Sequence, residues 1–458
     1  MPRSTARGGD LIPAREACAL LGISPATLYA YVSRGLVESR PGPDHRSRLY
    51  LRRDIERLAQ RKQAGRGAAR GAAQSLDRGL PVMETAISLI RPDSPYYRGR
   101  AAVAMVREGS TLEDAARLLW DCGDSDPFDP PPARGWPARV APIAGDAPCL
   151  SFGGLSKVHR ACGWRVGWAF VPVAPIAGDA SLPPLKRAMA AIPLLAVDER
   201  DSLNAAPATR RRIAATLLRQ NAALLVGASP DARPVHRLLA DAWRPGDEAF
   251  ADLVRAALVL CADHELNVSA FAARVVASTG AHLHGTVCAG LAALSGPRHG
   301  GATARAYALL ADAAAAGSPA AHVDERWHRG DELPGFHHVL YPDGDPRGAE
   351  VLAMLRRYRA GDPRMAHVEA VVEAAARTSG RLPNIDGMLA AICYVHQLPP
   401  APALVMFAAG RLAGWLAHAQ EQQAAGRLIR PRARYNGVLP ETPAADGPGG
   451  GEAVAGTG

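Results

Sequence analysis

The 458-residue chain is poor in aromatic residues, cysteine and lysine. Aromatic residues make up 5% of the chain, only three lysines occur, and the 48% that is hydrophobic is mostly Ala, Leu and Val. The seven cysteines form no CxxC pair, which argues against a zinc site or a disulfide framework. An Ala- and Leu-rich composition with few β-branched runs favours helices, so we expect a mainly α fold.

Long apolar segments are also missing. No apolar run reaches the roughly 18 residues that a membrane-spanning helix needs. The Arg-rich N-terminus lacks the apolar core of a signal peptide. We therefore expect a cytoplasmic protein with no membrane partner.

The positive charge is concentrated at one end of the chain, whose formal net charge is +9. Residues 1–70 hold 14 Arg and Lys against 6 Asp and Glu, so they carry +8 and the rest is close to neutral. A basic segment attached to a neutral body is typical of a nucleic-acid-binding module.

Residues 1–62 are expected to form that module. IPAREACALLG predicts one helix, and a Ser-Pro pair then begins a second helix, PATLYAYVSRGLV, with Leu28 and Val32 facing inward. SRPGPDHRSRLYL has a Pro/Gly turn between two extended runs, which is typical of a wing. The sequence therefore predicts a winged helix-turn-helix.

This order of elements resembles the DNA-binding domain of the MerR and excisionase families over about the first 60 residues. The resemblance and the basic charge point to DNA contacts on the second helix and the wing, at Tyr29, Arg34, Arg46 and Arg48. A small basic helical domain used for protein contacts is the alternative.

Two segments are not expected to fold. Residues 63–78 are rich in Gly, Ala and Arg and predict a linker, whereas residues 441–458 have no periodicity and predict a disordered tail. The body between them, residues 79–440, alternates helical patterns with loops that contain Gly, Pro and His.

Some residues in these loops suit one chemistry, although a single histidine is more often structural than catalytic. Removing a proton next to a carbonyl group needs a carboxylate base and a hydrogen-bond donor to the developing enolate oxygen. Asp386 in LPNIDGM offers the carboxylate, and His299 precedes a helical pattern whose dipole keeps an imidazole neutral. Several arginines outside the basic module suit a dicarboxylate, because a guanidinium binds a carboxylate through two bonds.

Seven segments of the body resemble citrate synthase in their order and spacing. They are YYRGR (96–100), ADHELNVSA (262–270), LSGPRHGGA (294–302), the G-F-x-H loop with DPR (335–347), PNID (383–386), GRLAGWLAH (410–418) and RPRARYNG (430–437). The resemblance implies an all-helical homodimer with a large and a small domain, the small one at roughly 303–405. It also implies the condensation of oxaloacetate with acetyl-CoA or propionyl-CoA, without a metal or a bound cofactor.

The resemblance further implies a role for each matching residue. Asp386 would remove the proton, His299 would stabilise the enol, and His338 would polarise the oxaloacetate carbonyl group. The residues that would hold oxaloacetate are His264, Arg347, Arg411 and, from the partner subunit, Arg430.

One position departs from the family pattern. The residue before the histidine of the G-F-x-H loop is usually Gly or small, and here it is His337. We expect a bulky residue there to tilt His338 or to hinder the approach of oxaloacetate, which affects the rate and the choice of 2-oxo acid.

The stretch SFGGLSKVHRACGWRVGW (151–168) is similar to the lysine segment of pyridoxal-phosphate aminotransferases, with Lys157 as the Schiff-base lysine. However, VAPIAGDA occurs at 140–147 and again at 173–180, so residues 141–173 have the pattern of an inserted loop. Pyridoxal enzymes also need a phosphate-binding turn and a carboxylate for the pyridine nitrogen, and neither signal lies upstream. We therefore expect Lys157 to have no cofactor role.

Three functions remain open at this point. The first is a condensing enzyme of the citrate synthase type with an appended DNA-binding module. The second is a DNA-binding regulator whose body senses a CoA ester or a 2-oxo acid. The third, more remote, is a pyridoxal-phosphate-dependent aminotransferase.

Overall fold

The computed structural model describes residues 83–129, 136, 173–199 and 201–431 of the body. In the N-terminal region it describes residues 11–21, 28, 32, 37, 39–41, 48–51 and 55. The chain divides into two compact units, Met1–Glu84 with Pro431–Gly458, and Thr85–Arg430. Lys157 with its surrounding segment, the predicted linker and the predicted tail all lie outside the described residues.

The N-terminal unit contains one described helix and a three-stranded antiparallel sheet. β1 (Leu11–Pro13) leads into α1 (Ala14–Leu21), and β2 (Ser39–Pro41) pairs with β3 (Arg48–Leu51) in the sheet order β1-β3-β2. β2 and β3 are the two extended runs of the predicted wing, which is confirmed. Leu28 is buried and Val32 packs against the same small core, as predicted.

The body begins with a small antiparallel sheet and two short helices. The sheet consists of β4 (Ser88–Arg91), β5 (Ser94–Tyr97) and β6 (Arg100–Ala101), in that order. α4 (Ala102–Arg107) and α5 (Leu112–Leu119) follow, and a capping box formed by the Thr111 and Asp114 side chains begins α5. The next described helix, α7 (Val173–Gly178), is part of the second copy of the repeated octapeptide.

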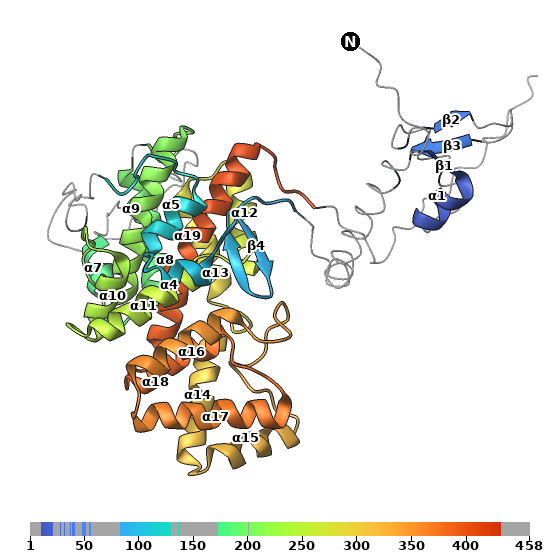
Figure 1. Cartoon of the computed structure of the whole chain (residues 1–458). Coiled ribbons are helices and arrows are strands. Elements are labelled where there is room, and N and C mark those ends of the chain that lie inside the picture. Colours follow the sequence, from blue (N-terminus) through green and yellow to red (C-terminus); the bar gives the residue numbers. More distant parts are fainter. Residues whose placement is uncertain are drawn as a thin grey trace, which may run out of the picture. The chain divides into compact units, whose positions relative to one another are not determined.

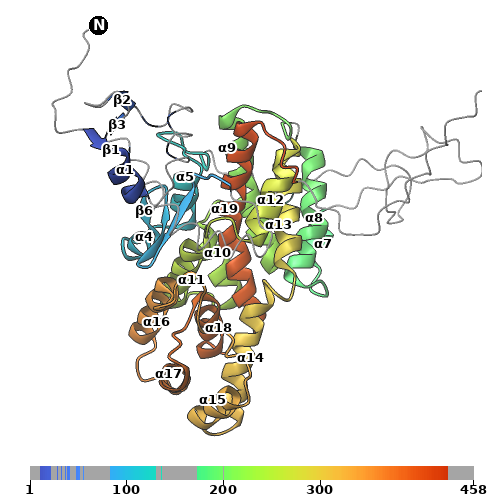
Figure 2. The same ribbon diagram turned by 90° about the vertical axis from the view of Figure 1, so that its right-hand side faces the viewer.

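A group of longer helices forms the core around α19. The group comprises α8 (Pro184–Asp198), α9 (Pro207–Val226), α10 (Val235–Trp243), α11 (Glu248–Cys261), α12 (Val268–Ser278), α13 (Leu283–Leu294) and α19 (Ala401–Ala425). α19 runs through the centre and contacts α9, α11, α12 and α13 (Figures 1 and 2). Glycines permit this close approach, because a Cβ atom at Gly290 of α13 would lie 2.5 Å from the Trp415 ring of α19.

Five further helices pack together beside this core. They are α14 (Gly301–Ala315), α15 (Pro319–His328), α16 (Pro346–Tyr358), α17 (Pro363–Ser379) and α18 (Ile385–Val395), yellow to orange in Figure 1. α16 and α18 join the group to the core through contacts with α11 and α19. These helices cover most of the range predicted for the small domain, and the boundary itself stays a prediction.

The described residues confirm the mainly α fold that the composition predicts. In this part of the chain, no helix is both long enough and apolar enough to cross a membrane.

Candidate active site

Two of the predicted histidines meet at one tyrosine. His264 lies in the turn between α11 and α12, and His338 lies in the loop between α15 and α16. The His264 Nε2 atom lies 3.0 Å from the Tyr341 hydroxyl oxygen, and the centroids of the two histidine rings are 5.1 Å apart. The Tyr341 ring lies 5.2 Å from the His338 ring, so the three rings form a single cluster.

Arg347 lies beside this cluster, in the first turn of α16. The Asp345 carboxylate caps that helix and binds the guanidinium through two bonds, 3.0 Å to Nε and 2.8 Å to Nη2. The guanidinium carbon lies 5.5 Å from the centre of the Tyr341 ring. Burial alone would lower the pKa of Arg347, but Asp345 raises it above its ordinary value, so Arg347 stays charged.

Asp386 is the second residue of α18, which docks directly on the loop that carries His338. The backbone N–H of Asn384 donates to the Gly335 carbonyl oxygen at 2.9 Å, and a Cβ atom at Gly387 would lie 2.3 Å from that oxygen. Burial raises the pKa of Asp386 to about 6, although Arg347 opposes the shift. A carboxylate with this pKa is a stronger base than an exposed one and is still mostly ionised at pH 7.

His299 precedes α14 and is held by Ser269 of α12. Its Nε2 atom lies 2.9 Å from the Ser269 hydroxyl oxygen, which also accepts a hydrogen bond from Trp415 Nε1 at 3.1 Å. The same hydroxyl lies 2.7 Å from Asn267 Oδ1, so its single hydrogen has two possible acceptors. The direction of that hydrogen therefore sets which nitrogen of His299 is protonated.

All three site histidines are neutral at pH 7. Burial lowers the pKa of His299 and of His338 to about 4, and it lowers that of His264 well below its ordinary value. The Leu340 backbone N–H donates to His338 Nδ1 at 3.2 Å, so the hydrogen of the neutral His338 ring is on Nε2. His338 can therefore donate a hydrogen bond through Nε2.

Arg411 is buried in the middle of α19 and lies between the turn that carries His264 and the region of His299. Its Nε donates to the Cys261 carbonyl oxygen at 2.8 Å, and its guanidinium lies 4.7 Å from the Phe407 ring, which also contacts His299. No described carboxylate forms an ion pair with Arg411. The buried positive charge is thus available to an anionic ligand.

Among the described residues predicted for the active site, Arg430 lies apart from the others. It is exposed and follows Ile429, whose backbone N–H donates to Ser278 Oγ at 3.1 Å. Ser278 ends α12, whereas Ser269, beside His299, lies at its start. Nine residues of α helix separate the two serines by about 13 Å.

His337 adopts a backbone conformation that favours glycine, with φ of +64°. Its backbone N–H donates to the Leu382 carbonyl oxygen at 2.9 Å, and its carbonyl oxygen accepts from Asn384 Nδ2 at 2.8 Å. The side chain is exposed, and His338 keeps its contacts with His264 and Tyr341. The effect of His337 on the orientation of His338 and on the approach of oxaloacetate stays a prediction.

One of the four predicted DNA contacts is described. Arg48 is the first residue of β3, is exposed, and donates from Nη1 to Ser39 Oγ at 3.0 Å across the wing. Tyr29, Arg34 and Arg46 lie outside the described residues.

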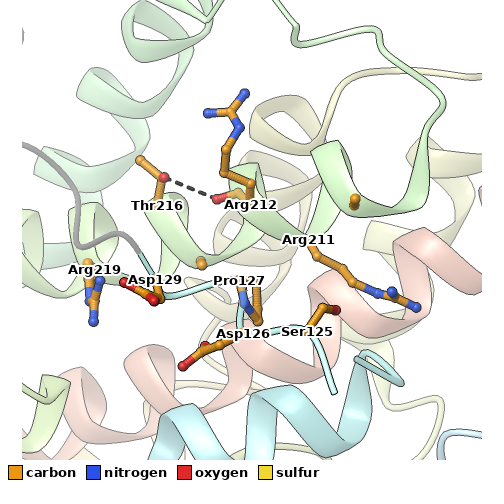
Figure 3. Close-up of a pocket in the computed structure, with 10 residues that line it drawn as sticks. Ser125, Asp126, Pro127, Asp129, Arg211, Arg212, Thr216 and Arg219 are labelled. Atoms are coloured by element: carbon orange, nitrogen blue, oxygen red, sulfur yellow. Dashed lines mark hydrogen bonds between the residues drawn. The ribbon is translucent and has the colours of Figure 1, made fainter. Parts of the chain in front are cut away.

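A cavity of about 350 Å³ lies elsewhere, between α9 and the loop after α5 (Figure 3). It is lined by Arg211, Arg212 and Arg219 of α9 and by Asp126 and Asp129 of the loop, and it contains none of the histidines described above. Arg212 pairs with Glu199 and Asp201, which lie outside the lining. We therefore place the chemistry at the histidine cluster. In the described part of the chain, no group of three His, Cys, Asp or Glu residues is arranged to hold a metal ion.

Several residues of the site were not singled out from the sequence. Tyr341 and Asp345 lie within the G-F-x-H and DPR segment, while Ser269 and Trp415 lie within two other matching segments. Their roles depend on contacts between distant segments, which the local sequence does not signal.

Comparison with known proteins identifies two families in the chain. Residues 14–63 match a helix-turn-helix domain, and residues 179–432 match the citrate synthase C-terminal domain. The putative citrate synthase 2 of Mycobacterium bovis is 35% identical over 205 residues, covering 43% of this chain and 54% of that protein. The 2-methylcitrate synthase of Shewanella oneidensis is 35% identical over 186 residues, covering 40% and 50%. The chain spans about half the length of these relatives.

Solved structures agree on the fold of the body. The citrate synthase of Pyrobaculum aerophilum has a TM-score of 0.61 at 24% identity, covering 80% of this chain and 93% of that one. The citrate synthase of Thermoplasma acidophilum, in a ternary complex with carboxymethyl coenzyme A and oxaloacetate, has a TM-score of 0.59 at 20% identity, covering 80% and 96%. The citrate synthase match spans more than half of the sequence, and the chain therefore belongs to the citrate synthase family.

Proposed function

We propose that this chain condenses an acyl-CoA thioester with oxaloacetate and releases CoA. One observation carries the proposal: Asp386, whose pKa is about 6, lies in the same region as two neutral histidines and two buried arginines. These are His299, His338, Arg347 and Arg411. A carboxylate base, neutral hydrogen-bond donors and a dicarboxylate site are the groups that this reaction requires.

Oxaloacetate would bind between Arg347, Arg411 and His264. Its two carboxylates need cationic partners, and Arg411 has no described carboxylate of its own. His338 would direct its Nε2–H to the keto oxygen and draw electron density from the carbon that is attacked.

Asp386 would take a proton from the carbon next to the thioester carbonyl group. His299 would donate a hydrogen bond to the thioester oxygen as negative charge develops there. The enol carbon then attacks the keto carbon of oxaloacetate, the new alkoxide receives a proton through His338, and water cleaves the thioester to release the CoA thiol. These steps require no metal and no bound cofactor.

This scheme sets a requirement on Ser269. His299 reaches Ser269 through Nε2, so it can donate to substrate only through Nδ1. The Ser269 hydrogen must then point to His299 Nε2 rather than to Asn267 Oδ1 in the working enzyme. Trp415 supports this arrangement by occupying one lone pair of the same hydroxyl oxygen.

Both acetyl-CoA and propionyl-CoA are candidate donors. They differ by one methylene group, which a pocket distinguishes by only about 1–3 kcal/mol. The test is the release of thiol from each donor with and without oxaloacetate. Release that depends on oxaloacetate supports the proposal, and folded protein that releases no thiol from either donor contradicts it.

The working unit would be a homodimer in which Arg430 enters the site of the partner subunit. The position of Arg430 at the far end of α12 supports this assignment, as do the exposed Val268 and the half-buried Phe271, Val275 and Cys288 on α12 and α13. The test mixes Asp386→Asn and Arg430→Ala subunits, because a heterodimer then has one intact site. We expect a statistical mixture to recover about a quarter of the wild-type activity, whereas an Arg430 that acts in its own subunit gives no recovery.

The N-terminal unit would bind DNA, and the whole protein would act in the cytoplasm. The helix-turn-helix match and the basic charge of residues 1–70 support DNA as a partner. Arg34→Ala is expected to weaken DNA binding and to leave thiol release unchanged. DNA binding unaffected by this change would contradict the assignment of Arg34.

A further inference from the structure

A buried carboxylate holds the turn that carries His264. Asp263 precedes that histidine, and its side chain has no solvent exposure. Its Oδ2 accepts hydrogen bonds from Ser88 Oγ of β4 and, at 3.2 Å, from the backbone N–H of Glu265. The carboxylate therefore ties the backbone that follows His264 to the residue that precedes it and to β4.

α19 supplies the group that faces the other oxygen of this carboxylate. His418 Nε2 lies 3.3 Å from Asp263 Oδ1, and neither side chain is exposed. One turn earlier, the Gly414 backbone N–H donates to the Ala262 carbonyl oxygen at 2.9 Å. A Cβ atom at Gly414 would lie 2.2 Å from Asp263 Oδ1, so only glycine permits this approach.

The polar contacts continue outward from His418. Its Nδ1 lies 3.5 Å from Arg274 Nη1, which also donates to Glu421 Oε2 at 2.6 Å. Glu421 in turn accepts from Thr85 Oγ1 at 2.9 Å and from the Ala86 backbone N–H at 2.8 Å. Thr85 is the first residue of the compact unit Thr85–Arg430, so this chain of contacts runs from the start of that unit to the turn that carries His264.

We propose that His418 is a positioning residue for His264, and that Arg274 and Glu421 extend this positioning unit to residues 85–86. The inference rests on the proposed function, in which His264 holds oxaloacetate. A displaced His264 would lose its alignment with His338 and Tyr341, and small misplacements of such groups reduce rates by as much as about 100-fold. The unit therefore sets the affinity for oxaloacetate rather than that for the CoA thioester.

The test compares His418→Gln with His418→Leu in the full-length protein. Gln can donate to the Asp263 carboxylate, whereas Leu cannot. We expect the KM for oxaloacetate to rise about tenfold or more in His418→Leu and to stay within about threefold of wild type in His418→Gln. The KM for the acyl-CoA should change little in either variant. His236→Leu, a buried histidine of α10, is the matched control and should leave both KM values unchanged.

Thr85→Val tests the end of the positioning unit that lies farthest from His264, without altering any residue near the site. It removes the hydrogen bond to Glu421 and the acceptor of the Ile87 backbone N–H, and it should raise the KM for oxaloacetate by about two- to fivefold. If the KM for oxaloacetate is unchanged in both His418→Leu and Thr85→Val, the inference is overturned and the proposed function is not. The same holds if the KM for oxaloacetate and the KM for the acyl-CoA rise equally in these variants. If His418→Leu fails to fold, a KM for oxaloacetate in Thr85→Val equal to that of wild type overturns the inference. Wild-type protein without oxaloacetate-dependent thiol release overturns the proposed function and the inference with it.

Discussion

Replacing Asp386 by Asn separates the chemical role of this residue from any structural one. The change keeps the shape of the side chain and removes the base. In the described structure the Asp386 carboxylate makes no hydrogen bond, and burial raises its pKa to about 6 from the usual 3.8. The folded protein therefore disfavours the ionised form, and the neutral amide of Asn should fit at least as well.

The expected effects on activity and stability have opposite signs. Loss of a general base lowers turnover by about 100- to 10,000-fold, and a 100-fold loss corresponds to about 2.7 kcal/mol of barrier. Because the folded pKa lies above the unfolded one, this carboxyl group lowers stability as the pH rises from about 4 to about 6, and the full loss remains at higher pH. We therefore expect Asp386→Asn to have the wild-type melting temperature or a higher one at pH 8.

The assay measures oxaloacetate-dependent thiol release alongside thermal unfolding by circular dichroism. Asp312→Asn, an exposed carboxylate on α14, is the control and should change neither quantity. Turnover within tenfold of wild type in Asp386→Asn would refute the assignment of the base. A large fall in melting temperature would show that the carboxylate stabilises the fold.

Three further predictions concern pH, the buried ion pair and His337. The kcat/KM for the acyl-CoA should rise as pH increases through about 6, where Asp386 loses its proton, and a pH-independent profile between 5 and 7 would contradict this. Arg347→Gln leaves the buried Asp345 carboxylate without its cation, so urea unfolding should show a loss of about 3–5 kcal/mol, and a loss below 1 kcal/mol would contradict the pairing. His337→Gly should gain about 1 kcal/mol in the same assay because φ is positive there, while His337→Ala should gain nothing.

The helical body and the wing were predictable because their signals are local. The wing has a Pro/Gly turn between two extended runs, and β2 and β3 form as expected. Helix starts such as Asp345-Pro346 combine a capping side chain with a first-turn proline. β1 was missed because a strand of three residues carries almost no pattern of its own.

The sequence singled out residues that lie near one another, but not the contacts between them. His264 lies beside His338, and Arg411 lies near both Asp386 and the Phe407 ring that contacts His299, while the roles of these residues stay predictions. The hydrogen bond between His264 and Tyr341 joins residues 77 positions apart, and no local period relates them. The positive φ angle of His337 was likewise not predictable, because the local sequence places a bulky residue where glycine is favoured.

The most direct test of the central claim is the identity of the carbon product. The protein is incubated with acetyl-CoA labelled with ¹³C at the methyl carbon and with oxaloacetate, and the products are resolved by NMR. The account predicts that the labelled carbon becomes a methylene group bonded to the former keto carbon of oxaloacetate. Labelled acetate alone would mean that the site hydrolyses the thioester without forming a carbon–carbon bond, and it would contradict the condensation.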